Sequence, residues 1–240
     1  MARMGKRLRA AQEHVDCNER YSLDDALARL PKTATAKFDE AIDIAVRLGV
    51  DPRQADQMVR GAVNLPHGVG KKVRVLVFAE GDAARAAEEA GADFVGSTEL
   101  IEKIQKEGWV DFDKAVATRS MMSKVGRLGR VLGPRGLMPA PKKGTVVAPE
   151  DIARVVREVK GGRVDFKVDR QGNVHSSVGK ASMTTDQLRE NILSLVQTLV
   201  RLKPASAKGT YVKNIAISST MGLGIRLDSY EVMRLASEIR

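Results

Sequence analysis

The residue types that most often perform catalysis or bind metals are few and widely spaced in this chain. The one cysteine is Cys17, and the three histidines are His14, His67 and His175. A single cysteine excludes an intrachain disulfide and a site with several cysteine ligands, and the histidines lack metal-ligand spacing. Neither a G-x-S-x-G nucleophile elbow nor an H-E-x-x-H zinc motif occurs. The sequence therefore predicts no catalytic site, no cofactor and no metal.

Two nucleotide-binding patterns are approached in the sequence but not completed. A P-loop ends in Gly-Lys followed by Ser or Thr, with another glycine five residues before the Gly-Lys glycine. Gly179 and Lys180 form such a pair, but Val174 stands at the first position and Ala181 at the last. The dinucleotide pattern G-x-G-x-x-G fails in the same way at residues 68–73.

Basic residues are concentrated in one segment rich in glycine and proline. It contains seven basic residues, four glycines, three prolines and no acidic residue. Glycines allow a backbone to approach phosphate closely, so the pattern indicates a loop that faces RNA. The alternative is a solvated loop with a structural turn. The basic residues are Arg119, Lys124, Arg127, Arg130, Arg135, Lys142 and Lys143.

The chain as a whole is basic and poor in aromatic residues. Lys and Arg number 40 against 30 Asp and Glu, which gives a formal net charge of +10, and aromatic residues make up 4%. A positive excess favours a polyanionic partner, because each neutralised phosphate releases counterions. Base stacking needs aromatic rings, so an RNA partner would be bound mainly through phosphates, sugars and backbone shape.

Two short segments offer a different kind of contact. Thr220, Met221 and Gly222 follow an apolar strand that ends in two serines, and hydroxyl groups there could bond to ribose 2′-OH groups. Lys37 and Phe38 lie where the first long strand opens, and the lysine there could meet a phosphate. The alternatives are that the first segment is an ordinary strand end, that Phe38 belongs to the core and that Lys37 is solvated.

Hydrophobic periodicity indicates the elements that would position these segments. Strands are expected where apolar residues alternate or form short runs, and helices where they recur every three or four residues. A helix after Ser22 and another after Thr184 have N-cap residues, and Thr184 with Gln187 forms a capping box. The expected strands are 38–48, 58–65, 73–79, 93–95, 115–117, 163–169, 173–178 and 211–218. The expected helices are 23–30, 82–90, 97–106, 121–132, 151–160, 184–202 and a short one after Asp228.

Two glycine-rich points divide the chain into parts with different patterns of predicted strands and helices. Strands alternate with helices between them, and the two flanks share an α+β pattern instead. The fold class is therefore α/β, with an α+β domain split between 1–67 and 161–240 and an inserted three-layer α/β Rossmann-like domain over 68–160. The glycines at the two crossings could act as hinges: Gly68, Gly70, Gly161 and Gly162.

The chain shows no targeting or membrane signal. The first 20 residues form a basic arm without the apolar run of a signal peptide, and no window approaches about 18 uninterrupted apolar residues. The expectation is a reduced, soluble, cytoplasmic protein that does not enter a membrane.

Several stretches together resemble the family of bacterial large-subunit ribosomal protein one, which forms the mobile lateral stalk beside the tRNA exit site. The resemblance runs nearly from the N-terminus to Gly222, and its most specific part is GRLGRVLGPRGLMPAPKKGTV. In one departure, the family's usual Pro-Asn-Pro-Lys is here Pro139-Ala140-Pro141-Lys142. The other matching stretches are TAKFDEAIDIAVRLGVDPRQADQMVRGAVNLPHGVGK, EEAGADFVG, GKASM and STMG.

The resemblance implies an RNA-binding domain built from both chain ends, with the middle domain inserted. It implies a ribosome-associated protein that binds a stem of large-subunit rRNA, assists release of deacylated tRNA from the exit site and represses its own operon mRNA. The residues that match the family's RNA-facing motifs are Lys37, Phe38, Glu40, Lys167, His175, Gly179, Lys180, Ser218, Thr220, Met221 and Gly222.

Two alternatives stay open from the sequence alone. A free translational regulator could use the same surface on mRNA only. An enzyme could bind a nucleotide on the inserted α/β domain, although the phosphate loop that this requires is missing.

Overall fold

The computed structural model describes residues 5–238 and divides the chain into two compact units. The split unit combines the chain up to Gly70 with the chain from Val164 onward, and the inserted unit is Lys71–Arg163. These bounds lie three residues after those drawn from the sequence. The mixture of helices with parallel and mixed sheets confirms the α/β class.

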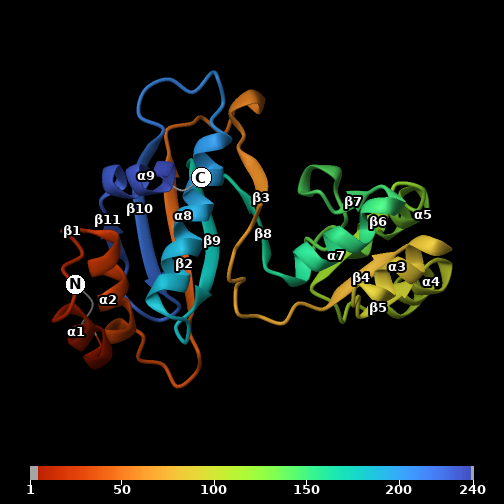
Figure 1. Cartoon of the computed structure of the whole chain (residues 1–240), viewed down its shortest axis with the longest axis horizontal. Helices are drawn as coiled ribbons and strands as arrows, with labels where there is room; N and C mark the ends of the chain where they lie inside the picture. Colours follow the sequence, from red (N-terminus) through yellow and green to blue (C-terminus); the bar gives the residue numbers. More distant parts are fainter. Residues whose placement is uncertain (1–4, 239–240) are drawn as a thin grey trace. The chain divides into compact units, whose positions relative to one another are not determined.

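The split unit is built on a five-stranded mixed sheet with the order β1-β11-β10-β2-β9, beside a two-stranded sheet of β3 and β8 (Figure 1). The strands are β1 (Arg20–Tyr21), β2 (Ala41–Leu48), β3 (Arg60–Asn64), β8 (Arg163–Lys167), β9 (Asn173–Lys180), β10 (Val212–Ser219) and β11 (Ile225–Leu227). The helices are α1 (Lys6–Gln12), α2 (Leu23–Thr33), the 3-10 turn η1 (Ala55–Gln57), α8 (Thr185–Arg201) and α9 (Ser229–Glu238).

Strand β2 shows why this sheet has one apolar face. Ile42, Ile44, Val46 and Leu48 are buried in the core, and the residues between them are exposed or half-buried. Side chains alternate between the two faces of a strand, so the apolar set meets helices packed on one side. Helices α2, α8 and α9 contact the sheet strands and supply that cover.

The inserted unit is a four-stranded parallel sheet with the order β5-β4-β6-β7. In β4, Val75 and Val77 join a core with α3 and α7, while Leu76 and Phe78 join a core with α4, α5 and α6. Helices on both faces make three layers, which explains the continuous apolar run. The strands are β4 (Val75–Phe78), β5 (Phe94–Gly96), β6 (Lys114–Thr118) and β7 (Val146–Val147). The helices are α3 (Asp82–Glu89), α4 (Thr98–Glu107), α5 (Met122–Val125), η2 (Gly126–Leu128), α6 (Gly129–Leu132), η3 (Pro141–Lys143), η4 (Pro149–Asp151) and α7 (Ile152–Lys160).

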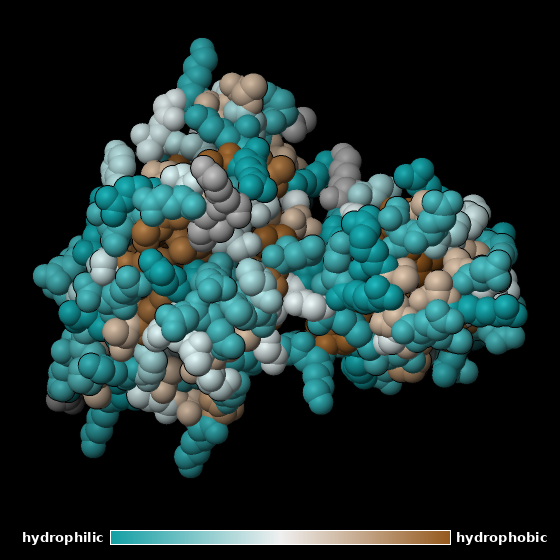
Figure 2. Space-filling model, viewed as in Figure 1, coloured by the Kyte–Doolittle hydropathy of each residue, from teal (hydrophilic) through white to brown (hydrophobic). Residues whose placement is uncertain are grey.

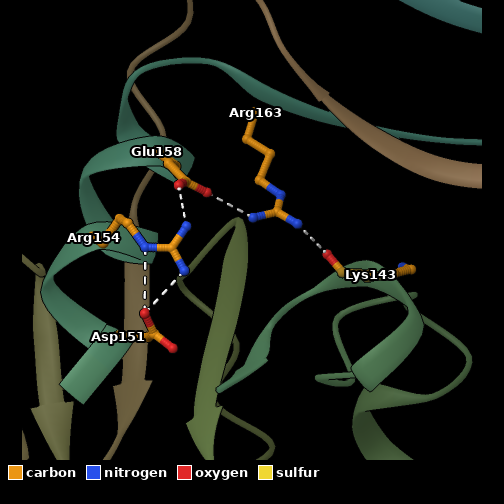
Figure 3. A network of polar contacts seen from close by, with 5 residues as sticks. All are labelled: Lys143, Asp151, Arg154, Glu158 and Arg163. Atoms are coloured by element: carbon orange, nitrogen blue, oxygen red, sulfur yellow. Dashed lines mark hydrogen bonds and ion pairs between the residues drawn. The ribbon is translucent and has the colours of Figure 1, made fainter. Parts of the chain in front are cut away.

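One polar network holds the end of the inserted unit in place (Figure 3). Arg163 donates to Glu158 Oε2 at 2.9 Å and to the carbonyl oxygen of Lys143 at 2.9 Å. Glu158 also accepts from Arg154, which donates to Asp151 as well. Arg163 is therefore bound to the inserted unit at the last residue before the chain returns to the split unit.

A buried asparagine anchors the chain within the split unit, just before it enters the inserted unit. Asn191 of α8 is fully buried, and its Nδ2 donates to the carbonyl oxygens of Gly68 at 2.9 Å and Val178 at 2.8 Å. Its Oδ1 accepts from the backbone N–H of His67 at 3.1 Å. Three backbone groups that would otherwise be unpaired are satisfied by one side chain.

The structure corrects the expected elements at several points. The N-terminal arm contains α1 and β1, and α2 continues past Pro31 to Thr33. The helix expected at 121–132 is divided into α5, η2 and α6, because glycines at 126 and 129 weaken it. Strands β1, β7 and β11 have two or three residues each, too few to give a periodic pattern. The N-cap of α2 and the capping box of α8 are confirmed.

Replacing Asn191 tests the anchoring of the outgoing chain. We expect Asn191→Leu to lower the midpoint of thermal unfolding, since three backbone groups lose their partner at a cost of roughly 1–3 kcal/mol. Differential scanning calorimetry measures the shift. Asp186→Asn, an exposed change on the same helix, is the control, and an equal shift in both variants would show that the buried contacts are unimportant.

Candidate nucleic-acid interface

Antiparallel pairing brings three distant chain segments to the same end of the large sheet. Strand β2 begins at Ala41, which pairs with Lys180 at the end of β9. Ile42 pairs with Ser219 at the end of β10. The residues before β2 therefore lie beside those that follow β9 and β10, although about 140–180 residues separate them in sequence.

Glu40 joins these segments through a buried carboxylate. Its side chain is 1% exposed, and Oε1 accepts from the N–H of Ala36 at 2.8 Å while Oε2 accepts from the N–H of Met221 at 2.9 Å. Burial by itself would raise the pKa of Glu40, but these two N–H groups and the nearby Arg7 guanidinium lower it overall. The carboxylate faces inward and positions its neighbours, and an RNA contact of Glu40 stays a prediction.

Thr220 and Gly222 also have structural partners at this end. The hydroxyl of Thr220 accepts from the N–H of Ala41 at 2.9 Å and lies 3.2 Å from the carbonyl oxygen of the same residue. A Cβ on Gly222 would collide with Ser219 Oγ and approach Thr33 Oγ1 at 3.1 Å. A larger residue at 222 would push the turn away from α2, so the glycine keeps the turn close to the sheet.

The result is a firmly held end surface with exposed apolar side chains. Phe38 is 56% exposed and Met221 is 45% exposed, and Lys37 beside Phe38 is exposed as well. The alternative that Phe38 belongs to the core is therefore wrong. Arg7 of α1 reaches the same place, where its Nη2 lies 3.5 Å from the carbonyl oxygen of Met221. We call Lys37, Phe38, Thr220, Met221 and Gly222 the end surface.

We call the face of the large sheet opposite the helices the open sheet face. It continues from the end surface and carries polar side chains. Ser218 and Ser177 flank Asp43, and His175 pairs with Ala45. His175 is exposed and Ser218 is half-buried, and the pairs further along are Arg47 with Asn173 and Arg47 with Asn214. A polar face without large apolar side chains, which carries serine hydroxyls and the exposed Arg47, can bind a sugar-phosphate backbone.

The remaining predicted RNA-facing residues have other surroundings. Gly179 is buried, and a Cβ there would meet Leu188 Cδ2 at 2.6 Å and Met183 Sδ at 2.8 Å, so packing against α8 explains this glycine. The prediction of an RNA contact at Gly179 does not fit that burial. Lys180 Nζ donates to the carbonyl oxygen of Asp39 at 3.2 Å and lies near the end surface.

Lys167 lies away from the end surface, near the turn between β8 and β9. Val168 forms an antiparallel bridge with Val174, which places Lys167 opposite His175 in the same register. Lys167 is exposed and lines a hollow with residues of both the 52–58 segment and the turn. The lining residues are Pro52, Arg53, Met58, Lys167, Val168, Asp169 and Arg170.

The four predicted hinge glycines are not equivalent. Gly68 is bound by Asn191 within the split unit, while Gly161 and Gly162 come before Arg163 and lie in the inserted unit. Gly70 is the last residue of the first segment of the split unit, with φ +70°.

The described residues were compared with the requirements of a metal site and of a membrane-spanning helix. Among residues 5–238, no group of three or more His, Cys, Asp and Glu is placed to hold a metal ion. Within the same range, none of the helices combines the length and apolar character of a membrane span.

The buried carboxylate of Glu40 predicts a pH dependence of stability. A lowered pKa in the folded state means that ionised Glu40 stabilises the fold above about pH 4.5, and this contribution is lost as the pH falls through the folded-state value. Glu40→Gln should unfold at a lower temperature than the wild type at pH 7, and the difference should narrow on acidification. Thermal unfolding from pH 7 to pH 3 measures this, with exposed Glu19→Gln as control. A difference that stays constant with pH would contradict the assignment.

Comparison with protein-family models matches residues 30–223 to the Ribosomal protein L1p/L10e family. The match contains the end surface, the open sheet face and the whole inserted unit. It leaves out α1 and the C-terminal segment with β11 and α9. Because the match spans most of the chain, the protein belongs to the ribosomal protein L1 family and is a large-subunit ribosomal protein that binds rRNA.

Proposed function

We propose that the split unit binds a stem of large-subunit rRNA through the end surface and the open sheet face. The observation that carries this proposal is the pair of exposed apolar side chains, Phe38 and Met221, held at one end of the sheet by buried Glu40. Exposed apolar side chains on a rigid frame can pack on sugars and on unstacked bases without loss of conformational entropy.

The chemistry of the interface follows from its composition. Lys37 and Arg7 supply positive charge for phosphates next to the apolar pair. Ser218 and Ser177 supply hydroxyls on the sheet face, which can bond to ribose 2′-OH groups and thereby favour RNA over DNA. Phosphate contacts fix the register of the RNA, and the shape of the end surface selects the stem.

The finer roles are proposals that rest on the family assignment. The protein assists release of deacylated tRNA from the exit site, and it represses translation of its own operon by binding mRNA with the same surface. The geometry gives no reason to assign catalysis, so the function is binding. Co-sedimentation with large subunits at moderate salt separates this proposal from a free regulator of mRNA, which would remain in the supernatant.

The two crossings between units support a further proposal of hinge motion. Asn191 holds Gly68, and Asp113 of the inserted unit holds Lys71 at 2.7 Å, so Gly70 lies between two anchors. At the returning crossing, Arg163 is held by the inserted unit and Val164 packs against the core of the split unit. Rotation about Gly70 and about the 163–164 connection would move one unit against the other.

Distances between labels on the two units test the hinge. We expect a broad distribution in the free protein, measured by pulsed electron–electron double resonance, and a narrower one when large-subunit rRNA is bound. Labels placed within one unit are the control and should give the same narrow distribution in both states. Distributions between the units that are narrow and identical with and without RNA would contradict hinge motion.

The end surface itself is tested by truncating its side chains. Met221→Ala and Phe38→Ala should each weaken binding of the rRNA stem by roughly 1.5–3 kcal/mol, the free energy of burying such an apolar side chain. Thr220→Ala should weaken it as well, because the turn loses the two side-chain hydrogen bonds to Ala41. Filter binding measures the affinities.

A matched control separates the site from exposed apolar surface in general. Tyr230 on α9 is 71% exposed and lies outside the end surface. Tyr230→Ala should leave the affinity unchanged. Equal affinity for the wild type and all three end-surface variants would overturn the assignment of the site.

A further inference from the structure

The basic segment of the inserted unit has one buried side and one charged side. Met121, Val125, Leu128 and Leu132 recur at helical spacing and join the core against β4 and α4. The segment α5-η2-α6 is therefore fixed to the unit rather than free as a loop. The basic residues of the segment point away from that core, because they occupy the intervening positions.

Four arginines on this segment have no described acidic partner. They are exposed, and no ion pair is assigned to them among residues 5–238; Lys124 by contrast pairs with Glu80 at 2.7 Å. On the opposite face of the sheet, Arg154 of α7 is engaged by both Asp151 and Glu158. Unpaired exposed charge of one sign creates a positive potential that attracts a polyanion. The four residues are Arg119, Arg127, Arg130 and Arg135.

The spacing of Arg127 and Arg130 suits a repeating anion. Arg127 lies in the 3-10 turn η2 and Arg130 lies in helix α6, three positions further along. Residues three apart on a helical surface are neighbours, with about 5–6 Å between their Cβ atoms. Two guanidinium groups in a row can each take one of two successive phosphates on a nucleic-acid strand.

Two glycines beside these arginines leave the backbone bare. Gly126 and Gly129 have φ of −53°, and a Cβ at either position would meet no atom within 4 Å. Neither the backbone conformation nor internal packing requires glycine there, and glycine destabilises a helical segment relative to alanine. Absence of side chains allows a partner's backbone to approach the row of arginines closely.

We propose that this surface of the inserted unit, with Arg127 and Arg130 at its centre and Arg119 and Arg135 beside them, binds the phosphate backbone of a second RNA segment. It rests on the proposed function, in which the split unit binds one stem of rRNA, and it adds a separate contact outside that stem. The inserted unit thereby becomes a second binding module rather than a spacer.

The composition of the unit favours an RNA backbone over other partners. None of the large apolar side chains exposed among residues 5–238 lies in the inserted unit, and its visible face is mostly hydrophilic (Figure 2). A helix that inserts into a membrane surface, or the centre of a protein–protein interface, would present such side chains. The aromatic residues Phe94, Trp109 and Phe112 pack against one another, so the surface contacts phosphates without base stacking.

The test compares the full chain with Arg127→Gln/Arg130→Gln on two RNAs. One is deproteinised large-subunit rRNA, and the other is the isolated stem cut from it. Affinity is measured by filter binding over a series of KCl concentrations. Arg85→Gln/Arg157→Gln is the matched control, because it removes two exposed charges from α3 and α7 on the other face of the same sheet.

The salt dependence distinguishes the outcomes. Each lost phosphate contact reduces the slope of log affinity against log salt by about 0.7–0.9, so the double variant should lose about 1.5 on the long rRNA and nothing on the stem. A loss no greater than that of the control on the long rRNA would overturn the second site. An equal loss on both RNAs would also overturn it, because the surface would then belong to the stem site. If the wild type bound neither the long rRNA nor the stem, the proposed function itself would be rejected.

Discussion

The pairing of β2 with β9 and β10 is the interaction on which the candidate RNA site depends. It joins the N-terminal segment to two strands that follow the inserted unit, and the register sets Ala41 beside Lys180 and Ile42 beside Ser219. A shift by one residue would move Ile42 and Ile44 out of the core, so burial holds the register firmly. The loops at the sheet end are consequently fixed by the core, although neither loop contains regular structure.

Glu40 explains how a carboxylate can belong to a surface that attracts phosphates. Its two oxygens accept backbone hydrogen bonds, and Arg7 lies close enough to lower its pKa further. The negative charge is thus balanced behind the surface by two N–H dipoles and one guanidinium. The apolar pair supplies shape, and the net charge of +10 supplies general attraction to RNA.

The sequence predicted the elements whose patterns are long and local, and missed those that depend on tertiary contacts. The capping box at Thr184 and the alternation along β2 are readable because neighbours in sequence determine them. Residue matching also found Glu40 and Gly179, but both are buried and their RNA contacts stay predictions. Glu40 is hydrogen-bonded to Met221, which is 181 residues away in the sequence. Gly179 is buried by packing against α8. The exposure of Phe38 was equally unreadable, since an aromatic residue before a strand is compatible with core or surface.

The two crossings show how a chain can carry an inserted unit without loose linkers. Anchors stand on both sides of each crossing: Asn191 and Asp113 around Gly70, and the Arg163 network before Val164. Two residues lie between the anchors at the first crossing, and none lies between Arg163 and Val164 at the second. The proposed hinge motion would therefore be a rotation about few bonds. If both units bind RNA as proposed, the short connection makes the second contact intramolecular and sets its effective concentration. Weak phosphate contacts from the inserted unit can therefore add to the affinity of the whole protein even though each arginine alone contributes little.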